Sequence, residues 1–217
     1  MIAGAKDADL ATHSSHFEWD CVVNSTDAAM SEFLGILEKA REAGLRHLVI
    51  PFLKKPNRTT LDDYKKVADH ANQAAAMAKV AGIQFSYHNH NFEFEPKEAG
   101  KRGSDIFMEE FSPDMQFEID VFWVKAAGLD SAELIRKLHG RVSQLHLKDL
   151  KDGLTLPSYS TGLPADAFKE LGNGIIPMEP IIVAVKAAGV VLCHVEQDQS
   201  PDAIASIKQS MAYLRGM

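Results

Sequence analysis

Short apolar runs alternate with longer amphipathic stretches along this chain, and this alternation limits the folds it can adopt more than any other feature. The first clear cycle is a helical stretch from Ser25 to Ala43, closed by Gly44, and then the apolar run from His47 to Phe52. Continuous apolar runs are typical of strands buried on both faces, and their alternation with helices is typical of βα units. The chain is therefore expected to form an α/β fold with a parallel sheet.

The same cycle repeats to the end of the sequence. Strands are expected at 11–15, 47–52, 83–90, 115–120, 142–148 and 190–196. Helices are expected at 25–43, 60–82, 104–111, 131–139 and 177–188, followed by a C-terminal helix with Pro201 in its first turn. No linker interrupts these six units, so residues 1–217 are expected to form one domain of the TIM (β/α) barrel type.

The strand count is short for a closed barrel. A complete (β/α)₈ barrel needs about 250 residues, so this chain of 217 residues is about two units short. Six strands would leave two sheet edges with unpaired backbone groups. We therefore expect either an incomplete form of a longer protein or a second chain that covers the gap, as in a homo-oligomer.

Charge and cysteine content exclude several classes of partner. The net charge of −7 and the lack of a Lys/Arg run argue against nucleic-acid binding. No apolar run approaches the roughly 20 residues of a membrane span. Cys21 and Cys193 form no C-x-x-C motif, and the N-terminus lacks the pattern of a secretory signal. The protein is expected to be cytoplasmic, with reduced thiols.

Residue parity predicts which polar side chains face the interior at the carboxyl ends of the strands. In each strand the apolar residues of one parity are expected to face the helices, which leaves the other parity inside. The inward ionisable side chains predicted in this way are His88 and His90, Glu118 and Asp120, His146 and Lys148, and His194 and Glu196. Four strands thus end in polar groups on the face where barrel enzymes hold their sites.

Clustered buried carboxylates and imidazoles need a compensating charge, and a divalent cation commonly supplies it. Two or three carboxylates with one or two imidazoles suit Mn²⁺, Mg²⁺, Co²⁺ or Zn²⁺, and the oxygen-rich mixture favours Mn²⁺. The alternative is that each of these residues is an isolated polar side chain with its own partners. Agreement of four strand ends in parity favours the metal site.

Five motifs occur in an order that resembles a known family. They are Tyr87-His88-Asn89-His90-Asn91-Phe92-Glu93-Phe94, Glu118-Ile119-Asp120-Val121-Phe122-Trp123, Leu145-His146-Leu147-Lys148-Asp149, Gly172-Asn173-Gly174-Ile175-Ile176 and His194-Val195-Glu196-Gln197-Asp198. Together they resemble the sugar phosphate isomerase/epimerase family of xylose isomerase-like TIM barrels. The resemblance implies a metal held by four ligands, which carry over to Glu93, Asp120, His146 and Glu196. It also implies that the first two βα units of the family barrel are absent.

Glu93 differs from the other three ligands of this set, because it lies in the loop past its strand. His88 or His90 is the alternative ligand at that position. Trp123 is a candidate for stacking on a sugar, or is structural.

Three further side chains are candidates for contact with the substrate. Lys148 is expected to bind a substrate oxygen or to neutralise a carboxylate. His13 and His16 are substrate-contact candidates, with surface exposure as the alternative. The Gly172-Asn173-Gly174 segment is expected to be a turn rather than a phosphate-binding loop.

The predicted reaction is isomerisation or epimerisation of a small carbohydrate, which removes a proton from the carbon next to a carbonyl. A metal would stabilise the enediolate, and His88 or His90 is the predicted base, with Glu93 and Glu196 able to act as both ligand and base. The same enolate can expel a neighbouring group, so a dehydratase or lyase acting on a keto-sugar or inosose is the nearest alternative. A further alternative is that the protein is a non-catalytic metal-binding subunit.

Overall fold

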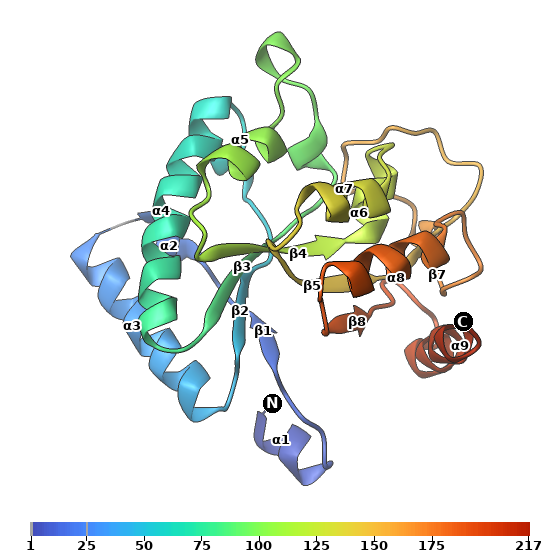
Figure 1. The fold of residues 1–217 in the computed structure, drawn as a ribbon, viewed down its shortest axis with the longest axis horizontal. Helices are drawn as coiled ribbons and strands as arrows, with labels where there is room; N and C mark the ends of the chain where they lie inside the picture. The colour runs from blue at the N-terminus through green and yellow to red at the C-terminus, as the bar shows by residue number, and fades with distance from the viewer. Residues whose placement is uncertain (1, 25) are drawn as a thin grey trace. The chain divides into compact units, whose positions relative to one another are not determined.

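The protein is described here from a computed structural model that covers residues 2–24 and 26–217 (Figure 1). Its residues gather into two compact units. Unit 1 contains the described residues up to His88 together with Ser104–Gln116, and unit 2 contains Asn89–Gly103 and Phe117–Met217.

Unit 1 is built on three parallel strands in the order β1 (Ser14–His16), β2 (His47–Ile50) and β3 (Gln84–His88). Leu48 pairs with Ser15 on one side and with Phe85 on the other. The helices of this unit are α1 (Ile2–Asp7), α2 (Asp20–Asn24), α3 (Asp27–Glu42), α4 (Leu61–Val80) and, starting one residue before the unit's second segment, α5 (Gly103–Glu110), with a 3₁₀ turn η1 at Lys55–Asn57.

The longest helix, α4, begins and ends where its sequence dictates. Thr60 and Asp63 form a reciprocal capping box at its start, and Gly82 adopts a left-handed φ of 75° just past its end. Its buried face consists mostly of alanines, which let the helix approach the strands closely. The buried residues are Tyr64, Val67, Ala68, Ala71, Ala74, Ala75 and Ala78.

Unit 2 contains a second parallel set in the order β4, β5 (Val142–Leu147) and β8 (Cys193–Val195). Strand β4 spans Met115–Asp120, and its residues from Phe117 onward belong to this unit. The register pairs Asp120 with His146 and His146 with His194, so the carboxyl ends of the three strands are level.

The rest of unit 2 consists of four helices, three 3₁₀ turns and one short pair of strands among the described residues. Its helices are α6 (Val121–Ala126), α7 (Ser131–Lys137), α8 (Met178–Ala187) and α9 (Ala203–Arg215), and its 3₁₀ turns are η2 (Phe92–Phe94), η3 (Glu98–Gly100) and η4 (Ala165–Ala167). Strands β6 (Asp149–Leu150) and β7 (Phe168–Lys169) form a short antiparallel pair.

The six predicted parallel strands and the six predicted helices are all present; the bounds of β4 match the prediction, and those of the other elements are shifted. Thr26 caps α3 through a hydrogen bond from the Ala29 amide. Ser25, the first residue of the predicted helix, lies outside the described residues. The placement of Pro201 was wrong: Asp202 caps α9, so the proline precedes the helix instead of starting it. Helices α1, α2 and α6 and the β6–β7 pair were not predicted.

Both cysteines are free. Among the described residues, no helix is both long enough and apolar enough to cross a membrane.

Candidate functional site

Asp120 lies where β4 passes directly into α6, and its carboxylate is fully buried. One oxygen, Oδ1, accepts hydrogen bonds from the backbone amides of Phe122 (2.8 Å) and Trp123 (3.3 Å), which caps the helix. The other oxygen, Oδ2, lies 3.0 Å from Lys148 Nζ. The Asn89 side chain fixes the Asp120 backbone by accepting from its amide (3.0 Å) and donating to its carbonyl (3.3 Å). Asp120 is thus held through both its carboxylate and its backbone.

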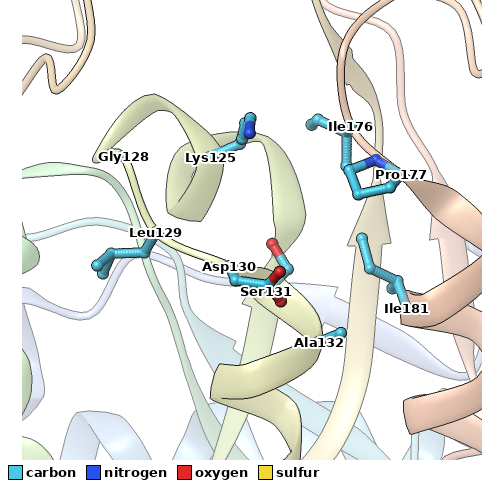
Figure 2. A pocket seen from close by; sticks show the side chains of 9 residues that line it. All are labelled: Lys125, Gly128, Leu129, Asp130, Ser131, Ala132, Ile176, Pro177 and Ile181. Carbon is cyan, nitrogen blue, oxygen red and sulfur yellow. The ribbon is translucent and has the colours of Figure 1, made fainter.

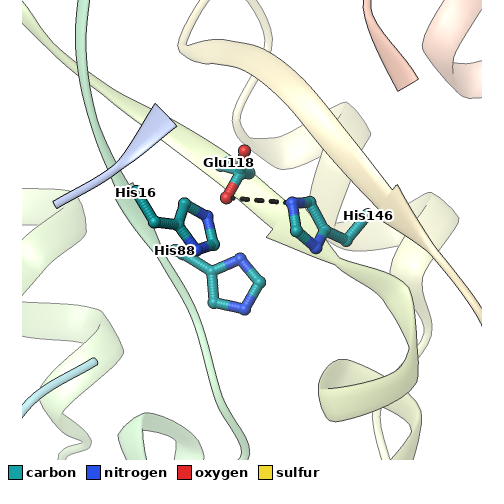
Figure 3. Close-up of side chains that lie close together, drawn as sticks. All are labelled: His16, His88, Glu118 and His146. Carbon is teal, nitrogen blue, oxygen red and sulfur yellow. Dashed lines mark ion pairs between the residues drawn. The ribbon is translucent and has the colours of Figure 1, made fainter. Parts of the chain in front are cut away.

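His146, near the end of β5, lies between two carboxylates. Its Nε2 is 3.3 Å from Glu118 Oε2, an ion pair that Figure 3 shows as a dashed line, and its Nδ1 is 2.8 Å from Glu196 Oε2. Burial alone lowers the pKa of His146, but the hydrogen bonds to Glu118 and Glu196 outweigh it and raise the pKa to about 10. With both ring nitrogens facing carboxylates, the imidazole is protonated near neutral pH.

Lys148, two residues further along, is 3% exposed and lies among three carboxylates. Its Nζ is 3.0 Å from Asp120 Oδ2, 2.6 Å from Glu196 Oε2 and 2.9 Å from Asp198 Oδ2. Burial lowers the pKa of Lys148, but these carboxylates raise it well above its usual range. Burial in turn raises the pKa of Glu196, yet the contacts with His146 and Lys148 hold it well below its usual range. Lys148 and Glu196 are therefore both charged near neutral pH.

The donor set fits a divalent cation. One ligand atom each from Asp120, His146 and Glu196 lies within 4.8 Å of the others. Around them, the carboxylates of Glu118, Asp120, Glu196 and Asp198 form ion pairs with Lys148 and His146, so the carboxylates outnumber the cationic side chains in this group. A histidine binds a metal only as a neutral imidazole, so metal binding would remove the His146 proton and make the group more negative. A divalent cation would offset that negative charge.

The structure places Glu93 outside that group of three. Glu93 lies in η2, is 1% exposed, and accepts a hydrogen bond from the His90 amide at 2.9 Å. The His90 ring stacks on Phe92 with centroids 5.4 Å apart and lies 5.0 Å from the Trp123 ring. His90 and Trp123, both predicted site residues, therefore share one aromatic cluster in unit 2.

Three other predicted histidines, His13, His16 and His88, belong to unit 1, whereas His194 lies in unit 2 with its Nε2 3.0 Å from Gln144 Oε1. The rings of His16 and His88 meet edge to face, with centroids 5.2 Å apart, at the carboxyl ends of β1 and β3 (Figure 3). His13 is exposed, and its backbone carbonyl accepts from the amides of Arg46 and His47.

Three residues with supporting contacts in unit 2 were not predicted as such from the sequence: Asp149, Asn89 and Asp198. Asp149 is fully buried, and its carboxylate accepts from the amides of Leu150, Gly172, Gly174 and Ile176. The Gly-Asn-Gly segment therefore binds an internal carboxylate, consistent with a structural turn. Asn89 and Asp198 also escaped notice, although both flank predicted site residues in the motifs.

A separate cavity of about 180 Å³ lies between the α6–α7 turn and the start of α8 (Figure 2). Its polar lining consists of Lys125, Asp130 and Ser131, whereas Ile176, Pro177 and Ile181 supply apolar walls. Asp130 caps α7 through the Glu133 amide, and the Ser131 hydroxyl donates to the Val121 carbonyl. Asp130 and Ser131 thus have structural partners, and none of the clustered donors lines the cavity.

Known proteins resemble this chain in sequence and in fold. Inosose dehydratases from two strains of Clostridium perfringens are 27% identical over 150 residues, which make up 63% of this chain and 48% of theirs. The chain thus matches about half the length of these curated relatives.

Solved structures cover the chain more fully. A sugar phosphate isomerase/epimerase from Parabacteroides distasonis is 26% identical with a TM-score of 0.78, covering 100% of this chain and 80% of that one. The IolI protein, solved with a zinc atom bound, is 15% identical with a TM-score of 0.73, covering 99% and 80%, and so shares the fold. Residues 5–217 also match the family described as xylose isomerase-like TIM barrel. With nearly all of its length matched and its strand-end motifs in order, the chain belongs to the xylose isomerase-like TIM barrel family.

Proposed function

We propose that this protein is a divalent-metal-dependent enzyme that acts on a sugar or keto-sugar and removes a proton from the carbon next to a carbonyl, as an isomerase or epimerase does. The observation that carries the proposal is the convergence of Asp120, His146 and Glu196 in unit 2. The likeness to a sugar phosphate isomerase/epimerase supports the substrate class.

Asp120, His146 and Glu196 would hold the metal, and Glu93 is proposed as the fourth ligand. Two or three carboxylates and one imidazole favour Mn²⁺, with Mg²⁺, Co²⁺ and Zn²⁺ as the alternatives. When bound, the cation supplies positive charge beside the carbonyl and hydroxyl oxygens of the substrate, where negative charge develops. Asn89 and the start of α6 keep Asp120 in place for this role.

The base is proposed to be His88 or His90, with Glu93 and Glu196 as carboxylates able to share that role. His90 is held by its stack on Phe92, which would orient its imidazole toward a bound sugar. Trp123 would stack on the sugar face, and Lys148 would donate a hydrogen bond to a substrate oxygen. His13 and His16 are proposed as further contacts to the substrate.

Metal analysis combined with solvent deuterium exchange tests this proposal. Purified protein should contain a stoichiometric divalent metal and should introduce deuterium from D₂O into a ketose or 3-keto-sugar. Asp120→Asn and His146→Gln should lose the metal, because each removes a ligand. His88→Gln or His90→Gln should keep the metal and lose exchange, whereas the exposed Asp166→Asn should change neither.

A wild-type chain that retains no metal after dialysis against trace Mn²⁺ would refute the proposal. Loss of metal in the His88 or His90 variants would instead make that histidine a ligand. Bound metal without exchange across the whole sugar panel would support a non-catalytic metal-binding subunit.

The second candidate is a dehydratase or lyase acting on a keto-sugar or inosose. Its support is the 27% identity to inosose dehydratases over 150 residues. Both reactions begin with the same proton abstraction, and they differ in whether the carbanion is reprotonated or expels a neighbouring hydroxyl. Mass spectrometry of the product distinguishes them, since dehydration removes 18 mass units of water whereas epimerisation leaves the mass unchanged.

A further inference from the structure

Lys148 is the buried cation of unit 2 that touches the proposed metal ligands most closely. It follows β5 directly, and its ammonium group lies within hydrogen-bond distance of Asp120 (3.0 Å), Glu196 (2.6 Å) and Asp198 (2.9 Å). The rings of Phe122 and Trp123 lie 5.7 and 5.8 Å from it. These aromatic rings limit where the ammonium group can move.

The oxygens that Lys148 contacts are the ones a metal would need. Asp120 Oδ1 is occupied by the amides of Phe122 and Trp123, so Oδ2, the oxygen nearest to Lys148, is the one left for a cation. Glu196 Oε2 is likewise contacted by Lys148. Lys148 and a metal bound to Asp120 therefore require the same oxygen, and Lys148 also occupies one of the two carboxylate oxygens of Glu196.

Asp198 offers the ammonium group a second position. It lies outside the group of three metal donors, yet its Oδ2 is 2.9 Å from Lys148 Nζ. Its side chain is 38% exposed, so it can adjust to a shifted lysine more freely than Asp120, which is fully buried. A lysine displaced from Asp120 and Glu196 would still be paired.

We propose that Lys148 is an internal counter-cation that competes with the metal for Asp120 Oδ2 and Glu196 Oε2 and shifts toward Asp198 when the metal binds. Without metal, Lys148 keeps the buried carboxylates neutralised and assembled. With metal, its proximity weakens binding, so the pair formed by Lys148 and Asp198 sets the metal affinity. This inference rests on the metal site of the proposed function.

Titration calorimetry with MnCl₂ on the metal-stripped chain tests the competition by the direction in which the Kd for Mn²⁺ changes. Lys148→Met should lower the Kd for Mn²⁺ about tenfold, because one competing positive charge is removed. Asp198→Asn should raise the Kd several-fold, because the lysine loses its second partner. In the double variant, Asp198→Asn should have little further effect, because no lysine remains to be positioned.

Matched controls come from the exposed ion pair of Lys151 with Asp166 in the same unit. Lys151→Met and Asp166→Asn change the net charge by the same amounts and should leave the Kd unchanged. An unchanged or raised Kd in Lys148→Met would overturn the inference. So would an equal effect of Asp198→Asn with and without Lys148.

Thermal unfolding supplies a readout that does not depend on activity. In EDTA, Lys148→Met should unfold at a lower temperature than wild type, and Mn²⁺ should raise its Tm by more than it raises that of wild type. If Lys148→Met fails to fold in either condition, Asp198→Asn decides: a raised Kd supports the competition and an unchanged Kd refutes it. A wild-type chain that binds no Mn²⁺ would refute the proposed function, whereas wild-type binding with no change in these variants would refute only the role of Lys148.

Discussion

At the scale of single residues, Asp149 shows how one buried carboxylate can hold several backbone segments together. Its carboxylate receives four backbone amides, from Leu150, Gly172, Gly174 and Ile176, at 2.8 to 3.1 Å. Charge-assisted hydrogen bonds of this kind are among the stronger ones in proteins. They tie the segment before α8 to the strand-end region that also carries Lys148.

Replacement of Gly174 by Ala should disrupt this arrangement. A Cβ at Gly174 would overlap the Leu150 carbonyl and the Asp149 carboxylate, both of which are held in place. We expect the free energy of unfolding to fall by about 2 kcal/mol or more, measured by urea denaturation. Gly162→Ala is the matched control, because its Cβ would meet only Ser160 Oγ at 3.5 Å. Equal stability of the two variants would show that the loop adapts without cost.

The role of Asp149 could not be predicted from the sequence, because three of its four amide partners lie 23 to 27 residues further along the chain. The clustering of Asp120, His146 and Glu196 could be predicted, since the parity of each strand is read from its own apolar residues. Glu118 was also predicted to face inward, and it contacts His146. The contact of Lys148 with three carboxylates depends on distances that parity does not give.

At the scale of secondary-structure elements, periodicity predicted the long helices and the strands but not the shortest elements. Helix α6 begins at Val121, directly after β4, and its apolar sequence reads as a continuation of the strand. Only Asp120, acting as N-cap, marks the change. Strands β6 and β7 have two residues each, too few to show an alternating pattern.

Two buried serines of helix α9 form polar contacts with the rest of unit 2. They are Ser206 and Ser210. The Ser206 hydroxyl donates to Glu170 at 2.6 Å, and Ser210 accepts from the Leu171 amide at 3.1 Å. The hydrogen bond from Ser206 lowers the pKa of Glu170. The helix is therefore held in part by an ionised carboxylate.

Glu170→Gln should lower the Tm of the chain at pH 7, as measured by circular dichroism. A lowered folded-state pKa stabilises the fold at pH values above the unfolded pKa of about 4.3, and the benefit is lost as the pH falls through the folded pKa. The difference from wild type should therefore shrink below about pH 4. Glu98→Gln, at an exposed carboxylate, serves as the control and should match wild type throughout. A difference that persists at low pH would assign the effect to packing.

At the scale of the whole molecule, the chain passes between its two units without a linker. The crossings fall after His88, after Gly103 and after Gln116, of which the last lies inside β4. Composition therefore gave no sign of the division, because linker signals depend on Gly, Pro and polar residues. The expectations of a single domain and of a second chain that covers open sheet edges remain predictions, and light scattering of the purified chain tests the latter.

The proposed metal ligands that converge all belong to unit 2, which predicts where metal binding should stabilise the molecule. Hydrogen–deuterium exchange with and without Mn²⁺ should show slower exchange at the ends of β4, β5 and β8, because a ligand that binds only the folded state suppresses local opening. Strands β1 to β3 of unit 1 should change less. His146→Gln should abolish the protection, which ties it to the site rather than to nonspecific ions. Protection that is strongest around His16 and His88 would instead move the metal ligands to unit 1, and the assignment of Asp120, His146 and Glu196 would fail.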